Sequence, residues 1–206
     1  MTEPRRVALL GGTFDPVHNG HLALATAARD AIGATESWMV PARTPALRSP
    51  PVAPVELRAA MLQAAVRPLR AVRVDEVELR RGGVSHTIDT IAELRDRHPA
   101  IEPWWILGSD AVRHIGEWHR GDELRSLIHV VVAQRAGARP FDDTEALHLG
   151  LAPERTIVLD LTPPPVSASE VRRRVASGES ISALVPAAVA DIIAASGLYR
   201  RVSAVR

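Results

Sequence analysis

Two residue types are missing from this sequence and a third is nearly so, and each scarcity excludes a class of chemistry. The chain has no cysteine and no lysine, and its only asparagine is Asn19. Without cysteine there can be no thiol nucleophile, no disulfide and no thiolate metal site. Without lysine there can be no Schiff base and no P-loop lysine. Any anion must therefore be held by arginine, histidine or backbone amides.

Net charge, aromatic residues and long apolar runs are also scarce. The formal net charge is +1, with 24 acidic residues interspersed among the basic ones, and aromatic residues make up 3% of the chain. No window approaches the roughly 18 apolar residues of a membrane span, and the charged residues 1–6 leave no room for a signal peptide. We therefore expect a cytoplasmic protein that binds neither nucleic acid nor a membrane. One asymmetry is a basic C-terminal region, most of which reads as a solvated helix face: Arg172, Arg173, Arg174, Arg200, Arg201 and Arg206.

The order of apolar patterns predicts the fold class. At 206 residues, residues 1–206 are expected to form a single domain that buries roughly 70% of its unfolded surface. Short apolar runs alternate with helical patterns, which is typical of parallel βαβ units. The predicted strands are 7–10, 37–40, 72–79, 104–107, 130–133 and 156–161, and the predicted helices are 22–32, 55–66, 87–97, 122–127, 168–176 and 187–195. We predict an α/β fold: a Rossmann-like, doubly wound, mainly parallel sheet with helices on both faces, binding ligands at the carboxyl ends of its strands.

Local signals add two expectations. Pro54 suits the first turn of a helix, and Ser167 with Glu170 has the spacing of a capping box. The proline-rich segment 41–54 is too short for a domain linker and is predicted to be a mobile loop, or lid, over a site.

The stretch GGTFDPVHNGH, residues 11–21, directly follows the first predicted strand. Gly11 and Gly12 would let a phosphate approach the backbone, and His18 and His21 fall on one face at the positive end of the next helix. This pattern predicts an anion site. The alternatives are two ordinary polar caps, or a zinc pair, which lacks an evident third ligand nearby. The G-x-G-x-x-G spacing of dinucleotide-binding loops is absent.

Five motifs in order resemble one family. Besides GGTFDPVHNGH they are VSHTIDTI at 84–91, WILGSDAV at 105–112 with the tryptophan at 118, VSASEVRRRV at 166–175, and LVPAAVADIIAASGLY at 184–199. Together they span nearly the whole chain. The sequence is similar to the bacterial nicotinate-nucleotide adenylyltransferases, which belong to the nucleotidyltransferase superfamily with the T/HxGH motif.

The resemblance implies a reaction and an ATP site. The 5′-phosphate of nicotinate mononucleotide would attack the α-phosphorus of ATP, giving deamido-NAD and pyrophosphate without a covalent enzyme intermediate. His21 would stabilise the α-phosphate in the transition state rather than the fold, and His18 would orient the triphosphate. Mg²⁺ would be carried mainly by the ATP phosphates, so no residue is assigned as a metal ligand. The ATP-binding set is Gly11, Gly12, Thr13, Phe14, His18, His21, Gly108, Asp110, Ser169 and Arg172, of which His18, His21 and Arg172 are the predicted catalytic residues.

Individual members of this set have competing interpretations. Ser169 and Arg172, at the start of a predicted helix, could hold the leaving pyrophosphate, whereas a capped surface helix accounts for the neighbouring arginines. Gly108 would allow close approach, and Asp110 would accept hydrogen bonds from ribose hydroxyls; a helix-capping role for Asp110 is the alternative.

The resemblance also implies a mononucleotide site, formed by Arg48, Thr87, Trp118 and Arg135. The pyridine ring would stack on Trp118, and backbone N–H groups around Thr87 and Trp118 would bind its carboxylate. A buried core position is the alternative for Trp118. The lid of relatives often ends in PPHK or PPHR, whereas this chain has PALR at 45–48. Arg48 keeps a cation for the mononucleotide phosphate, while Leu47 replaces the histidine and could simply pack in the loop.

Three other functions stay open at this point. Phosphopantetheine adenylyltransferases and cytidylyltransferases share the superfamily but differ in substrate, and a catalytically silent nucleotide-binding module could use the same fold. The intact His18, His21, Ser169 and Arg172 argue against a silent module. The sequence is compatible with a homo-oligomer and does not reveal the oligomeric state.

Overall fold

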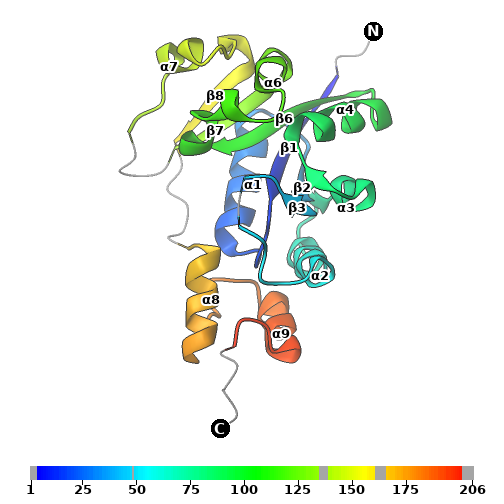
Figure 1. The fold of residues 1–206 in the computed structure, drawn as a ribbon, viewed down its shortest axis with the longest axis vertical. Coiled ribbons are helices and arrows are strands. Elements are labelled where there is room, and N and C mark those ends of the chain that lie inside the picture. The colour runs from blue at the N-terminus through cyan, green and yellow to red at the C-terminus, as the bar shows by residue number, and fades with distance from the viewer. Residues whose placement is uncertain (1–3, 48, 135–138, 161–165, 201–206) are drawn as a thin grey trace.

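The computed structural model describes residues 4–47, 49–134, 139–160 and 166–200, and a parallel sheet lies at its centre (Figure 1). Its strands are β1 (Arg5–Gly12), β2 (Glu36–Pro41), β4 (Val72–Val74), β6 (Ile101–Gly108), β7 (His129–Gln134) and β8 (Thr156–Asp160). They lie in the order β4-β2-β1-β6-β7-β8, and each neighbouring pair is parallel. The predicted doubly wound sheet is confirmed.

The strand order places a ligand site. The chain winds outward from β1 through β2 to β4, and then returns to place β6 on the other side of β1. The point at which the winding reverses therefore lies between β1 and β6, and in open α/β sheets ligands bind in the crevice outside the carboxyl ends of the strands at such a point. Gly12 ends β1 and Gly108 ends β6, so the motif loop and the WILGSDAV segment meet at the crevice.

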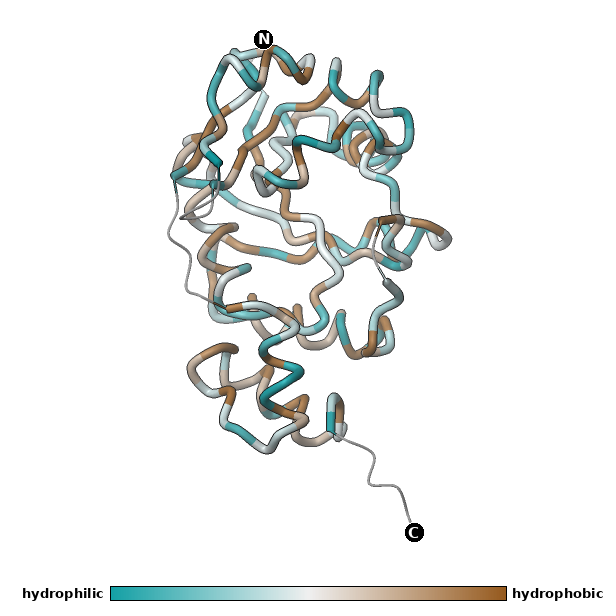
Figure 2. The backbone as a smooth tube through the Cα atoms, turned by 60° about the vertical axis from the view of Figure 1, so that its left-hand side comes forward, coloured by the Kyte–Doolittle hydropathy of each residue, from teal (hydrophilic) through white to brown (hydrophobic). Residues whose placement is uncertain are grey.

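Alternation along the strands creates a core on each face of the sheet. On β1, Ala8 and Leu10 join one hydrophobic cluster, while Val7 and Leu9 join the other. The first cluster packs against α1 (Asn19–Ala31), α2 (Val55–Val66), α8 (Ala168–Ser177) and α9 (Ala187–Ser196). The second packs against α3 (Val77–Arg81), α4 (Thr87–Arg97), α5 (Ser109–Val112), α6 (Gly121–Leu127) and α7 (Asp143–His148). Hydrophobic and hydrophilic residues accordingly alternate along the backbone in Figure 2.

One predicted strand was partly wrong. The segment 72–79 was expected to be a single strand, but β4 ends at Val74 and residues 77–81 form α3. The cause is local: the Asp75 carboxylate accepts a hydrogen bond from the Val77 N–H at 2.9 Å, which turns the chain out of the sheet.

The other helices begin close to their predicted positions. The bounds of α2 and α4 match the prediction, whereas α1 begins three residues early, at Asn19. Ser167 caps α8 by accepting from the Glu170 N–H at 3.2 Å, while the Glu170 carboxylate binds two arginines instead of completing the capping box. Pro54 directly precedes α2. Residue 161, the predicted end of the last strand, lies outside the described residues.

Short elements were not predicted. Besides α3, α5 and α7, they are β3 (Thr44–Pro45), β5 (Val84–Ser85), and the 3₁₀ turns η1 (Ile115–Glu117) and η2 (Pro153–Arg155). Because β3 pairs in parallel with β5, the proline-rich segment is partly held in a small sheet rather than being loop throughout.

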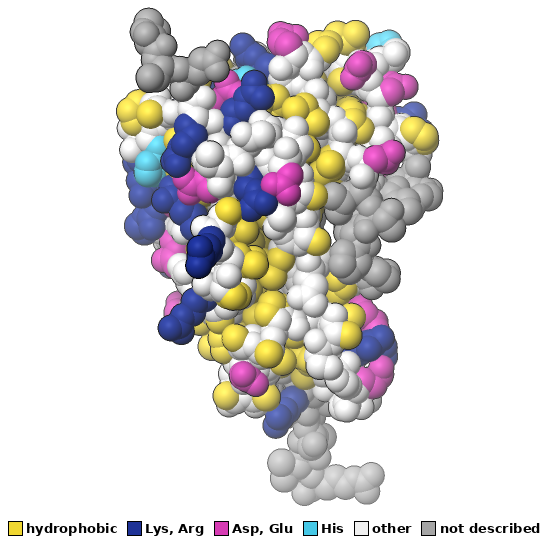
Figure 3. All heavy atoms as spheres, turned by 180° about the vertical axis from the view of Figure 1, so that it is seen from behind, with side chains coloured by type: hydrophobic (Ala, Val, Ile, Leu, Met, Phe, Trp, Pro, Cys, Tyr) yellow, Lys and Arg dark blue, Asp and Glu magenta, His cyan; other side chains and the backbone are white. Residues whose placement is uncertain are grey.

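The surface carries mixed charge. On the face shown in Figure 3, arginine and carboxylate side chains lie near one another around a band of hydrophobic side chains. Within the described residues, no helix is long and apolar enough to span a membrane.

Candidate functional site

Packing around the motif loop favours glycine at positions 11 and 12. A Cβ on Gly11 would lie 2.6 Å from Cζ2 of Trp105, and a Cβ on Gly12 would lie 3.0 Å from Cζ of Phe14. Aromatic side chains therefore pack closely against both glycines. At Gly108, by contrast, an added Cβ would meet no described atom within 4 Å apart from those of its chain neighbours, so the space beside the end of β6 is open.

His18 and His21 lie together where α1 begins. Their rings stack with centroids 3.6 Å apart and an interplanar angle of 18°. His18 is the N-cap residue of α1, and its backbone N–H donates to Nδ1 of His21 at 3.3 Å. Because Nδ1 accepts, a neutral His21 carries its proton on Nε2, where it can serve as a donor. The predicted placement on one face at the positive helix end is confirmed.

These histidines are helix caps as well as candidates for anion binding. The two side chains form a reciprocal capping box with the first turn of α1. Among the described residues, no group of three histidine, aspartate or glutamate side chains could hold a metal ion, so nothing described supports a zinc pair. At His21 capping and anion binding are compatible, because the ring atom that accepts from the His18 N–H is Nδ1 and not Nε2.

Phe14 shapes the loop between the glycines and the histidines. It is a buried residue with φ of 49°, in the left-handed region that non-glycine residues rarely adopt. Its ring meets the His21 ring edge-on at 5.0 Å. Phe14 therefore fixes the sharp turn of the loop and supports the position of His21.

Asp15 joins three distant segments, a role that the sequence did not reveal. Its carboxylate accepts from the N–H of Val52 at 2.7 Å, from the N–H of Ala53 at 3.0 Å and from the hydroxyl of Tyr199 at 2.7 Å. Burial and the Asp15 carboxylate raise the pKa of Tyr199, so its phenol stays a donor. The motif loop, the end of the proline-rich segment and the residues after α9 are thereby held together.

Arg172 reaches the same loop from α8. Its Nη1 donates to the backbone carbonyl of Asp15 at 2.6 Å. The first turn of α8, which carries the exposed Ser169, therefore lies beside the motif loop. The neighbouring arginines 173 and 174 bind Glu170 instead, at 2.8 and 2.7 Å, and lower the pKa of its carboxyl to about 2. They form the solvated face that the sequence predicted.

Arg58 is a second residue that sequence reasoning missed. Its side chain is almost wholly buried, with 1% relative exposure. Its guanidinium donates to three backbone carbonyls: those of Thr13 and Ala42 at 2.7 Å each, and that of Arg43 at 3.0 Å. The signal was its place on α2, because it shares an i, i+3, i+4, i+7 stripe with the buried residues Met61, Leu62 and Ala65.

The remaining ATP-site candidate lies at the end of β6. Asp110 is the second residue of α5, so it is not the cap of that helix. Its side chain is 75% exposed and lies 3.6 Å from the guanidinium of Arg113.

The mononucleotide candidates fall partly outside the structure, since Arg48 and Arg135 lie outside the described residues. Thr87 begins α4, and Trp118 follows η1. The adjacent rings of His86 and His119 are 4.3 Å apart, so the structure brings these two segments together. Trp118 is half-buried against the second core cluster.

Two details of this region revise the expectations. The N–H of Trp118 already donates to the carbonyl of Ile115 at 3.3 Å, so this amide is engaged within the fold. Leu47 is 66% exposed, which contradicts the alternative that it packs inside the loop.

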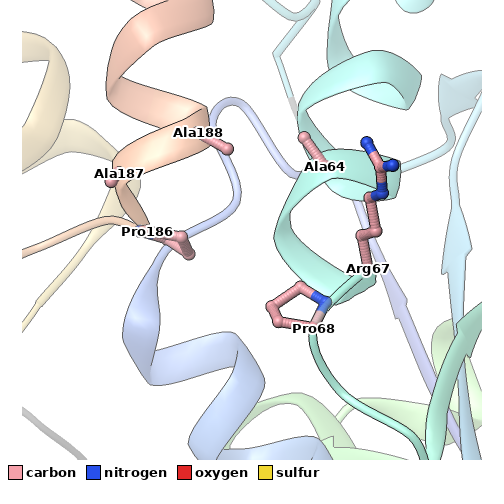
Figure 4. A pocket seen from close by; sticks show the side chains of 6 residues that line it. All are labelled: Ala64, Arg67, Pro68, Pro186, Ala187 and Ala188. Atoms are coloured by element: carbon pink, nitrogen blue, oxygen red, sulfur yellow. The ribbon is translucent and has the colours of Figure 1, made fainter.

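A separate hollow of about 530 Å³ lies between the end of α2 and the start of α9 (Figure 4). Its lining is mostly apolar, with one charged side chain: Ala64, Arg67, Pro68, Pro186, Ala187 and Ala188. Of its lining residues only Ala64 lies within α2, nearly two turns along that helix from Arg58.

Comparisons with known proteins place the chain in a family. Residues 9–174 match the model of the cytidylyltransferase-like family. A protein of Chromohalobacter salexigens named probable nicotinate-nucleotide adenylyltransferase is 37% identical over 211 residues, covering 95% of this chain and 96% of that protein. A protein of the same name from Bordetella petrii is 38% identical over 198 residues, covering 95% of this chain and all of that protein.

A solved structure shares the fold. The Plasmodium falciparum nicotinic acid mononucleotide adenylyltransferase complexed with NaAD superimposes with a TM-score of 0.79 at 18% identity, covering 95% of this chain and 97% of that one. With a family model matched over most of its length and relatives matched end to end, this chain belongs to the cytidylyltransferase-like family, among its nicotinate-nucleotide adenylyltransferase members.

Proposed function

We propose that this protein transfers the adenylyl group of ATP to nicotinate mononucleotide, forming deamido-NAD and pyrophosphate in NAD biosynthesis. The observation that carries the proposal is the stacked His18–His21 pair at the N-terminus of α1, beside the point where the winding of the sheet reverses. Relatives that match the chain over nearly its whole length bear the name of this activity. We treat residues 1–206 as one domain, which is supported by the six-stranded sheet that lies between the two cores.

The reaction asks the protein mainly for positioning and for charge neutralisation. A 5′-phosphate oxygen of the mononucleotide forms a bond to the α-phosphorus of ATP, and the bond from that phosphorus to the α,β-bridging oxygen breaks. Nε2–H of His21 donates to the non-bridging oxygens of the α-phosphate, where negative charge develops. His18 and the positive end of α1 orient the triphosphate.

Other residues hold the parts of ATP that do not react. The N–H groups of Thr13 and Phe14 bind phosphate oxygens, and Ser169 and Arg172 bind the leaving pyrophosphate. Gly108 leaves room for the nucleoside, whose ribose hydroxyls donate to Asp110. Mg²⁺, when bound with the triphosphate, screens the β- and γ-phosphates. Asp15, the buried carboxylate of the motif loop, is engaged by amides and Tyr199, so the residues present fit an ion carried mainly by the phosphates.

The mononucleotide binds where the start of α4 meets Trp118. The pyridine ring stacks on Trp118, and an N–H at the start of α4, near Thr87, meets its carboxylate. Since the Trp118 N–H is engaged with Ile115, we assign the second donor to the following peptide, at His119. Arg48 and Arg135 complete the site as phosphate and nucleotide contacts.

The test is pyrophosphate release from Mg-ATP with four acceptors: none, nicotinate mononucleotide, its amide analogue, and 4′-phosphopantetheine. We expect release with nicotinate mononucleotide, at a kcat/KM at least about 10²-fold higher than for the amide analogue. The two backbone N–H groups can both donate to a carboxylate, whereas the NH₂ group of an amide would face one of them, donor against donor. Release with phosphopantetheine alone, or with CTP replacing ATP, would assign another superfamily activity. No release with any acceptor would indicate a silent nucleotide-binding module.

A further inference from the structure

A buried arginine beside the motif loop, Arg58, lies outside the predicted site. Arg58 carries a cation inside the first core face, and within the described part of the chain its guanidinium binds backbone carbonyls and forms no ion pair with a carboxylate. Burial lowers the pKa of Arg58, and the field of Asp15 opposes that shift. A buried charge of this kind is costly to keep, so its three hydrogen bonds to main-chain carbonyls need an explanation.

The three carbonyls belong to two loops. Thr13 lies in the motif loop after β1, and Ala42 and Arg43 lie just after β2. The two loops are also joined directly, because the Ala42 N–H donates to the Gly12 carbonyl at 2.9 Å. Arg58 therefore fixes the backbone of the motif loop against the first residues of the proline-rich segment.

The hydrogen bonds to these carbonyls also set the directions of the neighbouring N–H groups. In a trans peptide the C=O and the N–H point in opposite directions, and the cis bond in this loop is a different one, Asp15–Pro16. With the Thr13 carbonyl turned inward to Arg58, the N–H of Phe14 must point away from the interior. With the Gly12 carbonyl turned toward Ala42, the N–H of Thr13 must likewise point away from Ala42.

We propose that Arg58 is a positioning residue for ATP: it holds the Thr13–Phe14 peptide in the one orientation that presents the Phe14 N–H to the phosphate chain. The inference rests on the proposed function for the assignment of these amides to phosphates. The left-handed conformation of Phe14 (φ 49°) makes the loop dependent on outside support, because such a conformation persists only where its surroundings impose it. Without Arg58, this peptide can rotate and turn a carbonyl toward the phosphates.

The test compares the binding of ATP with that of adenosine, which has no phosphates. We expect Arg58→Met to weaken ATP binding at least about tenfold and to lower kcat by a similar factor, since it displaces one preorganised donor, while adenosine binding changes less than about twofold. Arg58→Lys, which keeps the charge but not the planar fork, should fall between wild type and Met. Leu62→Ala is the matched control, because Leu62 is buried one turn along α2 and lies in the core cluster. It should lower Tm without changing the ratio of the two affinities.

A wild-type ratio of ATP to adenosine affinity in folded Arg58→Met, or in Arg58→Lys if Met does not fold, would overturn the proposal. So would failure of both variants to fold, because Arg58 would then be a requirement of the fold itself. The proposed function fails separately: a wild-type protein that binds ATP but releases no pyrophosphate with nicotinate mononucleotide refutes that function, and the affinity ratio still tests Arg58.

Discussion

Replacing His21 separates its two roles, because each ring nitrogen has its own task. Nδ1 accepts from the His18 N–H and caps α1, whereas Nε2 is the proposed donor to the α-phosphate. In His21→Asn, the amide oxygen can take the place of Nδ1 while nothing replaces Nε2. In His21→Ala both are lost.

The magnitudes differ for the two variants. Loss of one preorganised donor to a developing charge costs about 10² to 10³ in kcat, or about 2.7–4 kcal/mol, and we expect this in both variants. Loss of the cap costs about 1 kcal/mol, which lowers Tm by roughly 2–4 °C for a chain of this length. We expect that decrease in His21→Ala and little of it in His21→Asn. The sequence alone predicted a role in the transition state but no role in the fold.

The assay is continuous pyrophosphate release at saturating Mg-ATP and nicotinate mononucleotide, with thermal melts followed by circular dichroism. The dissociation constant of ATP should change much less than kcat, since the lost interaction strengthens only in the transition state. Near-normal turnover in His21→Asn would refute the assignment of Nε2. An equal loss of ATP binding and of kcat would show that His21 binds the ground state.

Further predictions concern the loop contacts, a buried carboxyl and the lid. Tyr199→Phe removes a hydroxyl that donates to Asp15 at 2.7 Å, and should cost about 1.5–3 kcal/mol in the free energy of unfolding; an unchanged Tm would contradict this. Burial raises the pKa of Glu78 above 4.5, so its ionisation destabilises the fold as pH rises from 4.5 through the folded pKa. Glu78→Gln, which can still accept from Thr90, should gain stability relative to wild type across that window in urea titrations; a constant difference would contradict this. Arg48→Ala should raise KM for the mononucleotide more than KM for ATP, and a larger change in the ATP term would refute that assignment.

The fold could be predicted from sequence because its signals are local and repeated. Apolar runs gave the central strands, and the bounds of α2 and α4 follow from helical periodicity. The start of α1 was missed by three residues because its cap is a histidine, outside the Ser, Thr, Asp and Asn that usually mark a helix start. The short helix α3 was missed because Asp75 ends the preceding strand within a segment where apolar and charged residues mostly alternate, as they do in a strand.

The candidate site could be predicted only where it is contiguous in sequence. The two histidines lie within one motif, so their spacing alone placed them on one face. The bond from Tyr199 to Asp15 spans 184 positions, and no local pattern reports such a contact. Arg58 is intermediate, because a charged residue on the buried stripe of α2 is visible in the sequence but its carbonyl partners are not.

Because the chain has no lysine, its charged contacts around the motif loop depend on arginine, histidine, aspartate and backbone groups. The proposed anion site uses imidazoles, amides, a helix end and the guanidinium of Arg172. A second guanidinium, that of Arg58, lies in the interior, where its planar fork reaches carbonyls of two loops at once. At the other end of the proline-rich segment, the negatively charged Asp15 side chain accepts hydrogen bonds from two backbone N–H groups. The segment is thus anchored at both ends. Arg58 binds the carbonyls of residues 42–43, and Asp15 binds the N–H groups of residues 52–53. Any rearrangement of this segment on substrate binding is therefore confined between the two anchors, and it starts from a motif loop that is already held in place.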